Sequence, residues 1–497
     1  MECHSAYRYM SNWGVIENHG LFEIGVCLPQ SEKTKQFIAF AVKNLEVQVR
    51  MQIMPDGVHW EQSPMYHNEV LHCLLDVILL AKRNGIALPD VILRQTEKMA
   101  MADVAWLKPD HHIVMMGDSD DVDVRDRISV AAYLFLNPVL RFGGFDRLDY
   151  ESIWDLGMKA GEEYAGMERR KPDFTSLFLE HSGNTYLRSD WSERANFLHL
   201  HSGTMGAGHG HSDKLHIDLV VNGEDVLMDG GRYTYVSGPK RFSYKDPSGH
   251  NTITVDDLPF TVCKDSWECS KLSQPVKENF RCMELAEFAQ AGQLGYMDLP
   301  GGVYVNRKVV YIKPDLYILV DEMYTGDCHT YQQYFHFNNH GAVTLTAPGE
   351  KKFPCVAYRG KMAEADFYFV SAQVKAELKR GHIARHYNVE EENTVCKVTK
   401  PGDGFTSLIT VIDAHPGRPL SIEKLPVRSA LKQTDYPETM AEALKITTGE
   451  KEYVVILCHQ EVNSPTDLVE ADGCMGYGNV IVFDKAEDVL VGDVLNW

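Results

Sequence analysis

The segment VYVNRKVVYIKPDLYILVDEM, residues 303–323, decides the fold class of this chain. Two runs rich in valine, isoleucine and tyrosine flank Lys313-Pro314-Asp315, and proline next to aspartate is typical of a turn. The segment therefore predicts an antiparallel hairpin. Similar runs recur without helices between them, at residues 184–188, 195–201, 216–221, 252–255, 330–337, 366–370, 406–412, 453–458 and 480–483. Such a series predicts antiparallel sheets packed as a sandwich.

The residues before the sheet region have a helical period. Apolar residues recur every three or four positions in residues 33–53 and 70–81, which predicts amphipathic helices, and further helices are expected over 124–136 and 150–164. The period changes after Lys171-Pro172. We therefore expect a multidomain α+β chain. A helical domain would cover residues 1–172 and an antiparallel β-sandwich residues 173–497, with a small C-terminal sheet from about residue 400.

Composition argues against several classes of protein. The net charge of −21 argues against a general binder of nucleic acid or anionic membranes, since both need a broad positive field. Neither a secretory signal nor an 18-residue apolar stretch is visible, so we expect a cytoplasmic protein, or a secreted or periplasmic one if the N-terminus is truncated. Eleven scattered cysteines without a CxxC pair indicate reduced thiols. A monomer and a homodimer both stay open.

Histidine, aspartate, tyrosine and glycine are concentrated in residues 206–256. If the segment around His209 is extended, alternate residues share one face, so His209, His211 and Asp213 point together. Asp229, before two glycines, and His250, before a β-branched run, can converge on them from neighbouring strands. Imidazoles combined with a carboxylate are a zinc-type ligand set.

The helical half contains its own candidate clusters. Residues 11–14 and 17–20 crowd amides, an indole and an imidazole together, with helix capping as the alternative interpretation. In residues 56–67, Ser63 and Pro64 fit the start of a helix, and this leaves Tyr66 as a candidate for proton transfer. Residues 117–123 lack the glycine and glutamate of a calcium loop, so we expect a solvated or capping loop there.

Several ordered motifs resemble those of the heparinase II/III-like polysaccharide lyase family. In the sheet half these are GHGHSDKL at 208–215, DGGRY at 229–233 and HNT at 250–252. Upstream, Asn18-His19 resembles the clamp for the substrate carboxylate, and residues 61–67 resemble the loop with the catalytic tyrosine. The resemblance implies an (α/α) toroid followed by a β-sandwich. The helical part here is shorter than such toroids usually are.

The resemblance also implies a reaction and a set of site residues. The reaction is β-elimination at a uronic acid, which needs a carboxylate clamp, a base and an acid. By resemblance Asn18 and His19 are the clamp and Tyr66 the acid, or both acid and base, with His209 as the alternative base. The metal ligands it implies are His211, Asp229 and His250, holding a mainly structural zinc with Asp213 as a hydrogen-bonding neighbour. Candidate substrate-binding residues are Asn12, Trp13, Trp60, Glu61, Tyr235, Arg241 and Tyr244, with packing as the alternative for the last tyrosines and solvation for the arginine.

The expected partner is therefore an acidic polysaccharide or oligosaccharide, of the glycosaminoglycan or alginate type, cleaved by a carbon–oxygen lyase. Two alternatives stay open. One is a zinc-dependent hydrolase that uses the same three ligands to activate water. The other is a carbohydrate-binding protein without activity.

Overall fold

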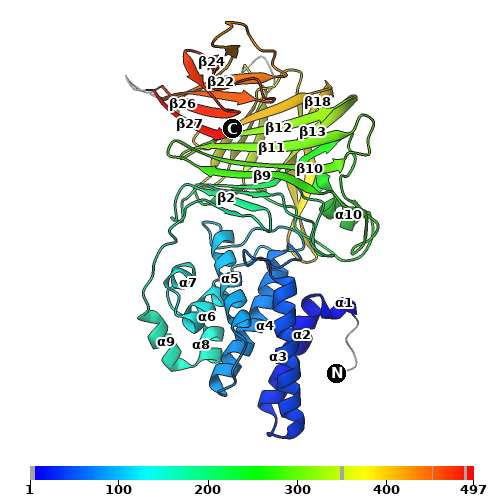
Figure 1. Cartoon of the computed structure of the whole chain (residues 1–497), viewed down its shortest axis with the longest axis vertical. Helices are drawn as coiled ribbons and strands as arrows, with labels where there is room; N and C mark the ends of the chain where they lie inside the picture. Colours follow the sequence, from blue (N-terminus) through cyan, green and yellow to red (C-terminus); the bar gives the residue numbers. More distant parts are fainter. Residues whose placement is uncertain (1–5, 347–351, 450, 486–489, 497) are drawn as a thin grey trace.

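The computed structural model describes residues 6–346, 352–449, 451–485 and 490–496. In these ranges a helical region is followed by antiparallel sheets, which confirms the α+β architecture (Figure 1). The helices are α1 (Ala6–Tyr9), α2 (Asn12–Cys27), α3 (Glu32–Gln52), α4 (Pro64–Arg83), α5 (Asp90–Trp106), α6 (Arg125–Phe135), α7 (Pro138–Gly143), α8 (Tyr150–Leu156) and α9 (Met158–Ala165). None of the described helices combines the length and apolarity that a membrane span requires.

Three of the four helices expected from the sequence form at the predicted positions, as α3, α4 and α6. The stripe in residues 33–53 is α3, and the capping Ser31 accepts a hydrogen bond from the Thr34 backbone N–H at 3.2 Å. The single helix expected over residues 150–164 is wrong. Gly157, with φ of 92°, divides it into α8 and α9, because this backbone conformation does not continue an α-helix.

Two large sheets pack face to face and a third layer covers one of them. The nine-stranded sheet has the order β1-β2-β3-β4-β5-β13-β18-β17, with β6 on β13; the eight-stranded sheet has the order β14-β15-β16-β19-β12-β11-β10-β9; and a five-stranded sheet has the order β20-β22-β23-β26-β27. The first sheet consists of β1 (Leu177–Leu179), β2 (Asn184–Arg188), β3 (Phe197–His201), β4 (His216–Val221), β5 (Glu224–Leu227), β6 (Ile253–Val255), β13 (Cys328–Phe337), β17 (Lys375–His386) and β18 (Val389–Asp403). The second consists of β9 (Pro275–Cys282), β10 (Ala286–Tyr296), β11 (Val303–Ile312), β12 (Leu316–Thr325), β14 (Ala342–Thr346), β15 (Cys355–Arg359), β16 (Glu364–Phe369) and β19 (Thr406–Asp413). The third consists of β20 (Leu420–Leu425), β22 (Ala441–Thr448), β23 (Lys451–Cys458), β26 (Val480–Asp484) and β27 (Val491–Asn496).

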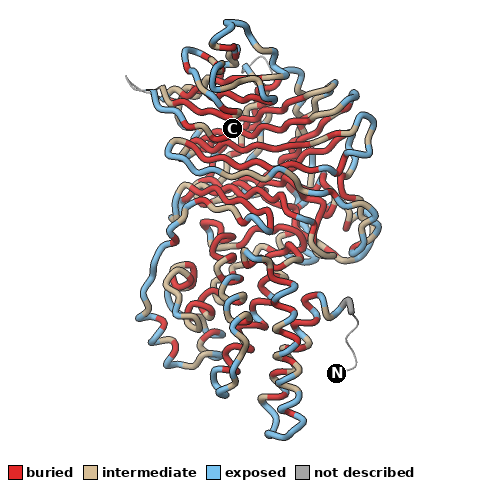
Figure 2. Tube along the Cα trace, in the orientation of Figure 1, coloured by how far each residue is buried: buried red, intermediate tan, exposed pale blue. Residues whose placement is uncertain are grey.

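The predicted hairpin is the β11–β12 pair, in register from Val303 opposite Thr325 to Ile312 opposite Leu316. It lies in the middle layer, so successive side chains enter different cores. Val309 packs in the core shared with the nine-stranded sheet, whereas Val310 packs in the core shared with the five-stranded sheet. Burial on both faces explains why the runs at 309–312 and 316–320 are continuously apolar, and the buried strands are visible in Figure 2.

The helical region packs against the first strands of the nine-stranded sheet. One apolar core contains helical residues together with Tyr186, Phe197 and Val220 from β2, β3 and β4. Arg188 of β2 also donates to the Leu107 carbonyl at the end of α5, at 2.5 Å. The two regions therefore share a core, and the loops at their junction are held in fixed positions.

Candidate active site between the helical and sheet regions

A cavity of about 1000 Å³ opens at the junction of the two regions. Its walls come from the start of α2, from residues 60–69 around the start of α4, and from the loop 207–209 of the sheet region. Five aromatic side chains line it, namely Trp13, Trp60, Tyr66, Tyr235 and Trp267. Aromatic faces with a few polar groups among them are typical of a ligand-binding pocket.

Tyr66 lies in the first turn of α4 and its hydroxyl is held from the sheet side. The Tyr66 and Tyr235 hydroxyl oxygens are 2.8 Å apart, and Arg232 Nη1 donates to the Tyr235 oxygen at 2.7 Å. Because the Tyr235 oxygen accepts from the guanidinium, its own proton is free to point at Tyr66. Burial raises the pKa of Tyr66, while the hydrogen bond with Tyr235 and the charge of Arg232 oppose that rise.

The position of Tyr66 depends on the way α4 begins. Ser63 and Pro64 occupy the N-cap and first-turn positions that the sequence predicts. Ser63 does not accept the capping hydrogen bond itself. Ser119 Oγ accepts it instead, from the Met65 backbone N–H at 3.0 Å. The Ser63 hydroxyl instead donates to the Asp118 carbonyl at 3.1 Å. The start of α4 and the loop around Asp118 are thereby fastened together.

His209 lies directly against Tyr66. Their rings are stacked, with centroids 3.5 Å apart and planes 15° from parallel. His209 Nδ1 is 3.0 Å from Asp118 Oδ2, and this carboxylate favours the tautomer with the proton on Nδ1. Nε2, which lies 3.9 Å from Glu61 Oε2, is then left as the proton acceptor.

The expectation that His209, His211 and Asp213 share the face of a strand is wrong. Residues 206–215 form turns and not a strand, so the alternation of side chains does not apply. His209 faces the cavity, His211 Nε2 lies 2.8 Å from Asp118 Oδ1, and Asp213 pairs with His201 at 3.5 Å.

Asp118 connects His209, which lines the cavity, to the candidate metal ligand His211, a connection that sequence reasoning missed. A solvated or capping loop is expected at residues 117–123. Ser119 does cap α4, whereas solvation is wrong for Asp118, whose side chain is fully buried. Arg241 compensates the buried charge with two hydrogen bonds, at 2.6 and 2.8 Å. Burial alone would raise the pKa of Asp118, but hydrogen bonds from His209 and His211 and the charge of Arg241 hold it well below its ordinary value.

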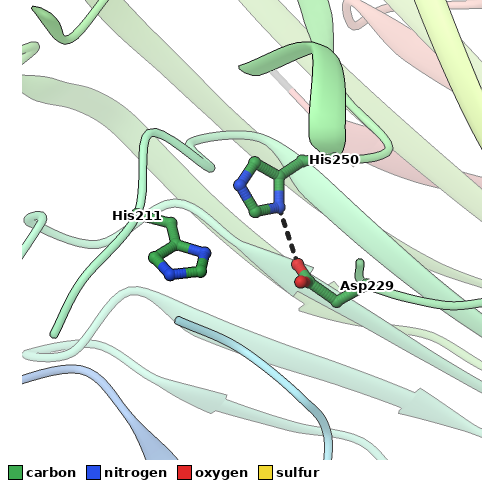
Figure 3. Close-up of side chains that lie close together, drawn as sticks. All are labelled: His211, Asp229 and His250. Carbon is green, nitrogen blue, oxygen red and sulfur yellow. Dashed lines mark hydrogen bonds and ion pairs between the residues drawn. The ribbon is translucent and has the colours of Figure 1, made fainter. Parts of the chain in front are cut away.

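Three predicted metal ligands converge, as Figure 3 shows. One side-chain ligand atom from each of His211, Asp229 and His250 lies within 4.8 Å of the others, and all three residues are buried. His250 Nδ1 is 2.8 Å from Asp229 Oδ2. His211 Nδ1 and His250 Nε2 are buried without a hydrogen-bond partner among the described residues. Two orphaned imidazole nitrogens beside a carboxylate fit a metal ion, so this cluster can hold one.

The structure does not bring Asn18 and His19 into the cavity, so their predicted placement there is wrong. Asn18 has no exposed surface. Its Nδ2 donates to the Gly14 carbonyl one turn earlier in α2 at 2.7 Å, and its Oδ1 accepts from Asn44 of α3 at 3.0 Å. His19 points at α4. The first residue of α2, Asn12, lines the cavity instead.

The predicted substrate-binding residues divide into two groups. Those that line the cavity are Asn12, Trp13, Trp60, Glu61 and Tyr235, and their roles stay predictions. Arg241 and Tyr244 do not line it. Arg241 is committed to Asp118, and the Tyr244 hydroxyl donates to Glu390 at 2.6 Å. Sequence reasoning missed Trp267, which lines the cavity and packs edge-on against His209, and no motif marks its position.

Two family models match this chain. The one described as "Heparinase II/III N-terminus" matches residues 3–138, and the one described as "Heparinase II/III-like, C-terminal" matches residues 171–421, half of the chain. The chain belongs to the heparinase II/III-like family. Within the family, the C-terminal match contains His209 and all three candidate metal ligands, and the N-terminal match contains Asn12, Tyr66 and Asp118.

Similar heparinase II/III-like proteins include two curated relatives named heparin-sulfate lyase. The one from Pedobacter heparinus is 25% identical over 286 residues, covering 53% of this chain and 40% of the relative. The one from Bacteroides thetaiotaomicron is 23% identical over 339 residues, covering 64% of this chain and 45% of the relative. This chain therefore spans less than half the length of either relative.

Solved structures show the same fold. The heparan sulfate lyase HepC from Pedobacter heparinus matches with a TM-score of 0.72 at 18% identity, covering 91% of this chain and 67% of that chain. A crystal structure of heparinase III matches with a TM-score of 0.72 at 17% identity, covering 91% of this chain and 68% of that one. These likenesses establish a heparinase III-like fold.

Proposed function

We propose that this protein is a polysaccharide lyase that cleaves a uronate-containing chain by β-elimination. The observation that carries the proposal is the pairing of Tyr66 with His209 in one aromatic cavity. Each of these proton-transfer groups has its own charged support, Arg232 through Tyr235 for the first and Asp118 for the second. Elimination needs two proton transfers at neighbouring atoms, and two supported groups in contact suit that demand.

The first requirement of the reaction is to stabilise charge on the uronate carboxylate when the C5 proton leaves. Asn12 offers an amide, and its backbone N–H fixes Glu61 by donating to Oε1 at 3.1 Å. Burial raises the pKa of Glu61, which favours the protonated carboxyl, and Oε2 has no hydrogen-bond partner among the described residues. We assign the clamp to these two residues in place of Asn18 and His19. Each such donor typically contributes about 3 kcal/mol to the transition state.

The second requirement is a base and an acid. His209 Nε2 accepts the C5 proton, and the Asp118 carboxylate stabilises the imidazolium that forms. Tyr66 donates its proton to the leaving O4, and the Tyr235 hydroxyl then donates to the tyrosinate. Since Arg232 pairs with Tyr235 and with Asp120, the charge that stabilises the tyrosinate is fixed before reaction.

A zinc ion held by His211, Asp229 and His250 would supply structural cross-linking, because elimination needs no metal-bound hydroxide. His211 also contacts the Asp118 carboxylate that orients His209. The metal cluster and the base are thus connected through one buried side chain. Fixing His211 would therefore fix the orientation of the base.

The charge of the cavity lining favours a substrate with few sulfate groups. Among the described lining residues the only arginine or lysine is Arg8, which pairs with Glu17 and lies over the Trp13 ring. The lining also contains Glu61 and Glu69. A heavily sulfated chain would need more cations than this. We therefore propose a weakly sulfated or unsulfated uronate chain, of the glycosaminoglycan or alginate type.

Product absorbance tests the proposal. Purified protein is incubated with hyaluronan, chondroitin, heparan sulfate, heparin and alginate, and ultraviolet absorbance is followed together with new reducing ends. Elimination produces both signals, and we expect them with a weakly sulfated polymer. Reducing ends without ultraviolet gain would instead support the zinc-dependent hydrolase, and binding without either signal would support a carbohydrate-binding protein.

A further inference from the structure

A second group of metal-ligating side chains lies outside the cavity, between α2 and α4. His19 and Glu23 are one turn apart on α2, and His72 and Asp76 are one turn apart on α4, so each pair shares a helix face. His19 Nε2 is 2.7 Å from Asp76 Oδ2 and 3.6 Å from Glu23 Oε1. The ligand atoms of His19, Glu23 and Asp76 all lie within 4.8 Å of one another.

The surroundings of this group suit a cation. A cavity of about 70 Å³ is lined by Asp76 and His72, so water can reach the Asp76 side of the group. Its other charged lining residues are Asp126, Arg127, Glu151 and Asp155, and Arg127 is already paired with Asp126. The side chains of His19, Glu23 and Asp76 are 14%, 44% and 27% exposed, so an ion can reach them from solvent.

We propose that His19, Glu23 and Asp76 form a second site for a divalent metal ion of the zinc class. One imidazole and two carboxylates are ligands that zinc accepts, with water to complete the set. His72 is in a position to add a fourth protein ligand, because its ring centroid lies 6.4 Å from that of His19 and its side chain is exposed. Residues one turn apart on facing helices form metal sites in helix bundles in the same way.

The site would act on the catalytic cavity through the two helices. Both helices begin at the cavity: Asn12 is the first residue of α2, and Tyr66 is in the first turn of α4. His19 and His72 each follow about two turns later, roughly 10 Å along the helix axis. A metal ion bridging them fixes the spacing between the helix that carries the proposed clamp and the helix that carries the proposed acid. This consequence rests on the proposed function, whereas the metal site itself does not.

Zinc stoichiometry tests the site independently of activity. Protein stripped with a chelator is dialysed against Zn²⁺ at mildly alkaline pH, because the ion must displace the proton that His19 and Asp76 share. We expect two zinc ions in the wild type and one in His250→Ala. Glu23→Gln and Asp76→Asn should each weaken the second site by about tenfold or more. The control is His415→Ala, which removes a histidine 3.5 Å from Asp315 and should retain both ions.

Two results would overturn the inference. One is a wild type that binds a single zinc ion lost in His250→Ala, since the cluster would then be only an ion pair between helices. The other is unchanged zinc affinity in both Glu23→Gln and Asp76→Asn. If His250→Ala does not fold, the wild-type stoichiometry and the Glu23→Gln protein decide, because Glu23 is a surface residue and glutamine has its shape. Failure of lyase activity alone would leave these zinc measurements unaffected.

Discussion

Replacing Tyr66 with phenylalanine separates catalysis from folding at this site. The change removes one oxygen and keeps the ring that stacks on His209 with centroids 3.5 Å apart. Among the described residues, the hydrogen bond lost is the 2.8 Å contact with Tyr235, so we expect the free energy of unfolding to fall by about 1 kcal/mol. Loss of a general acid lowers the rate by about 10² to 10⁴, equivalent to roughly 3–5 kcal/mol in the barrier. The rate should therefore fall far more than the stability.

The assay is single-turnover ultraviolet gain on the best polymer of the panel, with enzyme in excess so that product release does not limit the rate. Urea unfolding of the same preparations gives the free energy of unfolding of each variant. Tyr244→Phe is the matched control. It also removes a partly buried tyrosine hydroxyl, which donates to Glu390 at 2.6 Å, but this hydroxyl lies outside the cavity. It should turn over at the wild-type rate. Tyr235→Phe should fall between the two, since the Tyr66 hydroxyl stays and loses its partner.

A Tyr66→Phe rate within about threefold of wild type would refute the assignment, because that is less than 1 kcal/mol in the barrier. A rate equally reduced in Tyr244→Phe would refute it as well, since the effect would then come from a general loosening of the fold. A slow Tyr66→Phe enzyme with an unchanged binding constant for the polymer is the result that we expect.

Three further predictions concern stability. Asp118→Asn should lower the free energy of unfolding, measured in urea, by about 3–5 kcal/mol, because it leaves the buried guanidinium of Arg241 without its paired carboxylate. His459 lies 2.7 Å from Glu322 and 3.1 Å from Glu442. Burial opposes the charged form of all three groups, but hydrogen bonds and nearby positive charge lower the pKa of both carboxyls to about 2, and the two carboxylates raise the pKa of His459. The carboxylates then contribute to the free energy of unfolding above about pH 4.5, and this contribution is lost toward pH 2. The histidine contributes below about pH 6.5, and its contribution is lost above its raised pKa. The difference in unfolding free energy between wild type and His459→Gln should therefore be largest near pH 5–6. Chelation of zinc should lower the Tm of the wild type by more than that of His250→Ala, because the variant has only the ion proposed between α2 and α4 to lose.

For each of these three predictions a control variant or a specific result would contradict the reasoning. Asp123→Asn, at a partly exposed ion pair with Arg125, should cost less than about 1 kcal/mol, and an equal loss in both variants would contradict the role of Asp118. A stability difference for His459→Gln that does not vary from pH 3 to pH 9 would contradict the buried network. Two zinc ions per protein after both His211→Ala and Asp229→Ala are introduced would contradict the first metal site, because only the ion proposed between α2 and α4 should remain.

The sequence by itself determined the parts of this protein that depend on local patterns. The runs of valine, isoleucine and tyrosine around a proline turn predict the hairpin at 303–323, and the period of 3.6 predicts helices such as α3, because burial of one or both faces of an element selects apolar residues there. The order of the short motifs was enough to indicate the family. It also selected Tyr66, His209 and three candidate metal ligands. The structure places the first two in one cavity and the three ligand atoms within 4.8 Å of one another, and the roles of these residues stay predictions.

Only the tertiary structure decided which polar side chains meet. Asn12, Asn18 and His19 lie within two turns of one helix, yet helix geometry points them in different directions, toward the cavity, α3 and α4 respectively. Asp118 lies far along the chain from His209 and Arg241, and nothing in its own neighbourhood of sequence reveals that their charges compensate it. A buried charge is stabilised by whatever the fold brings against it, so its partners are set by packing between regions and not by spacing along the chain.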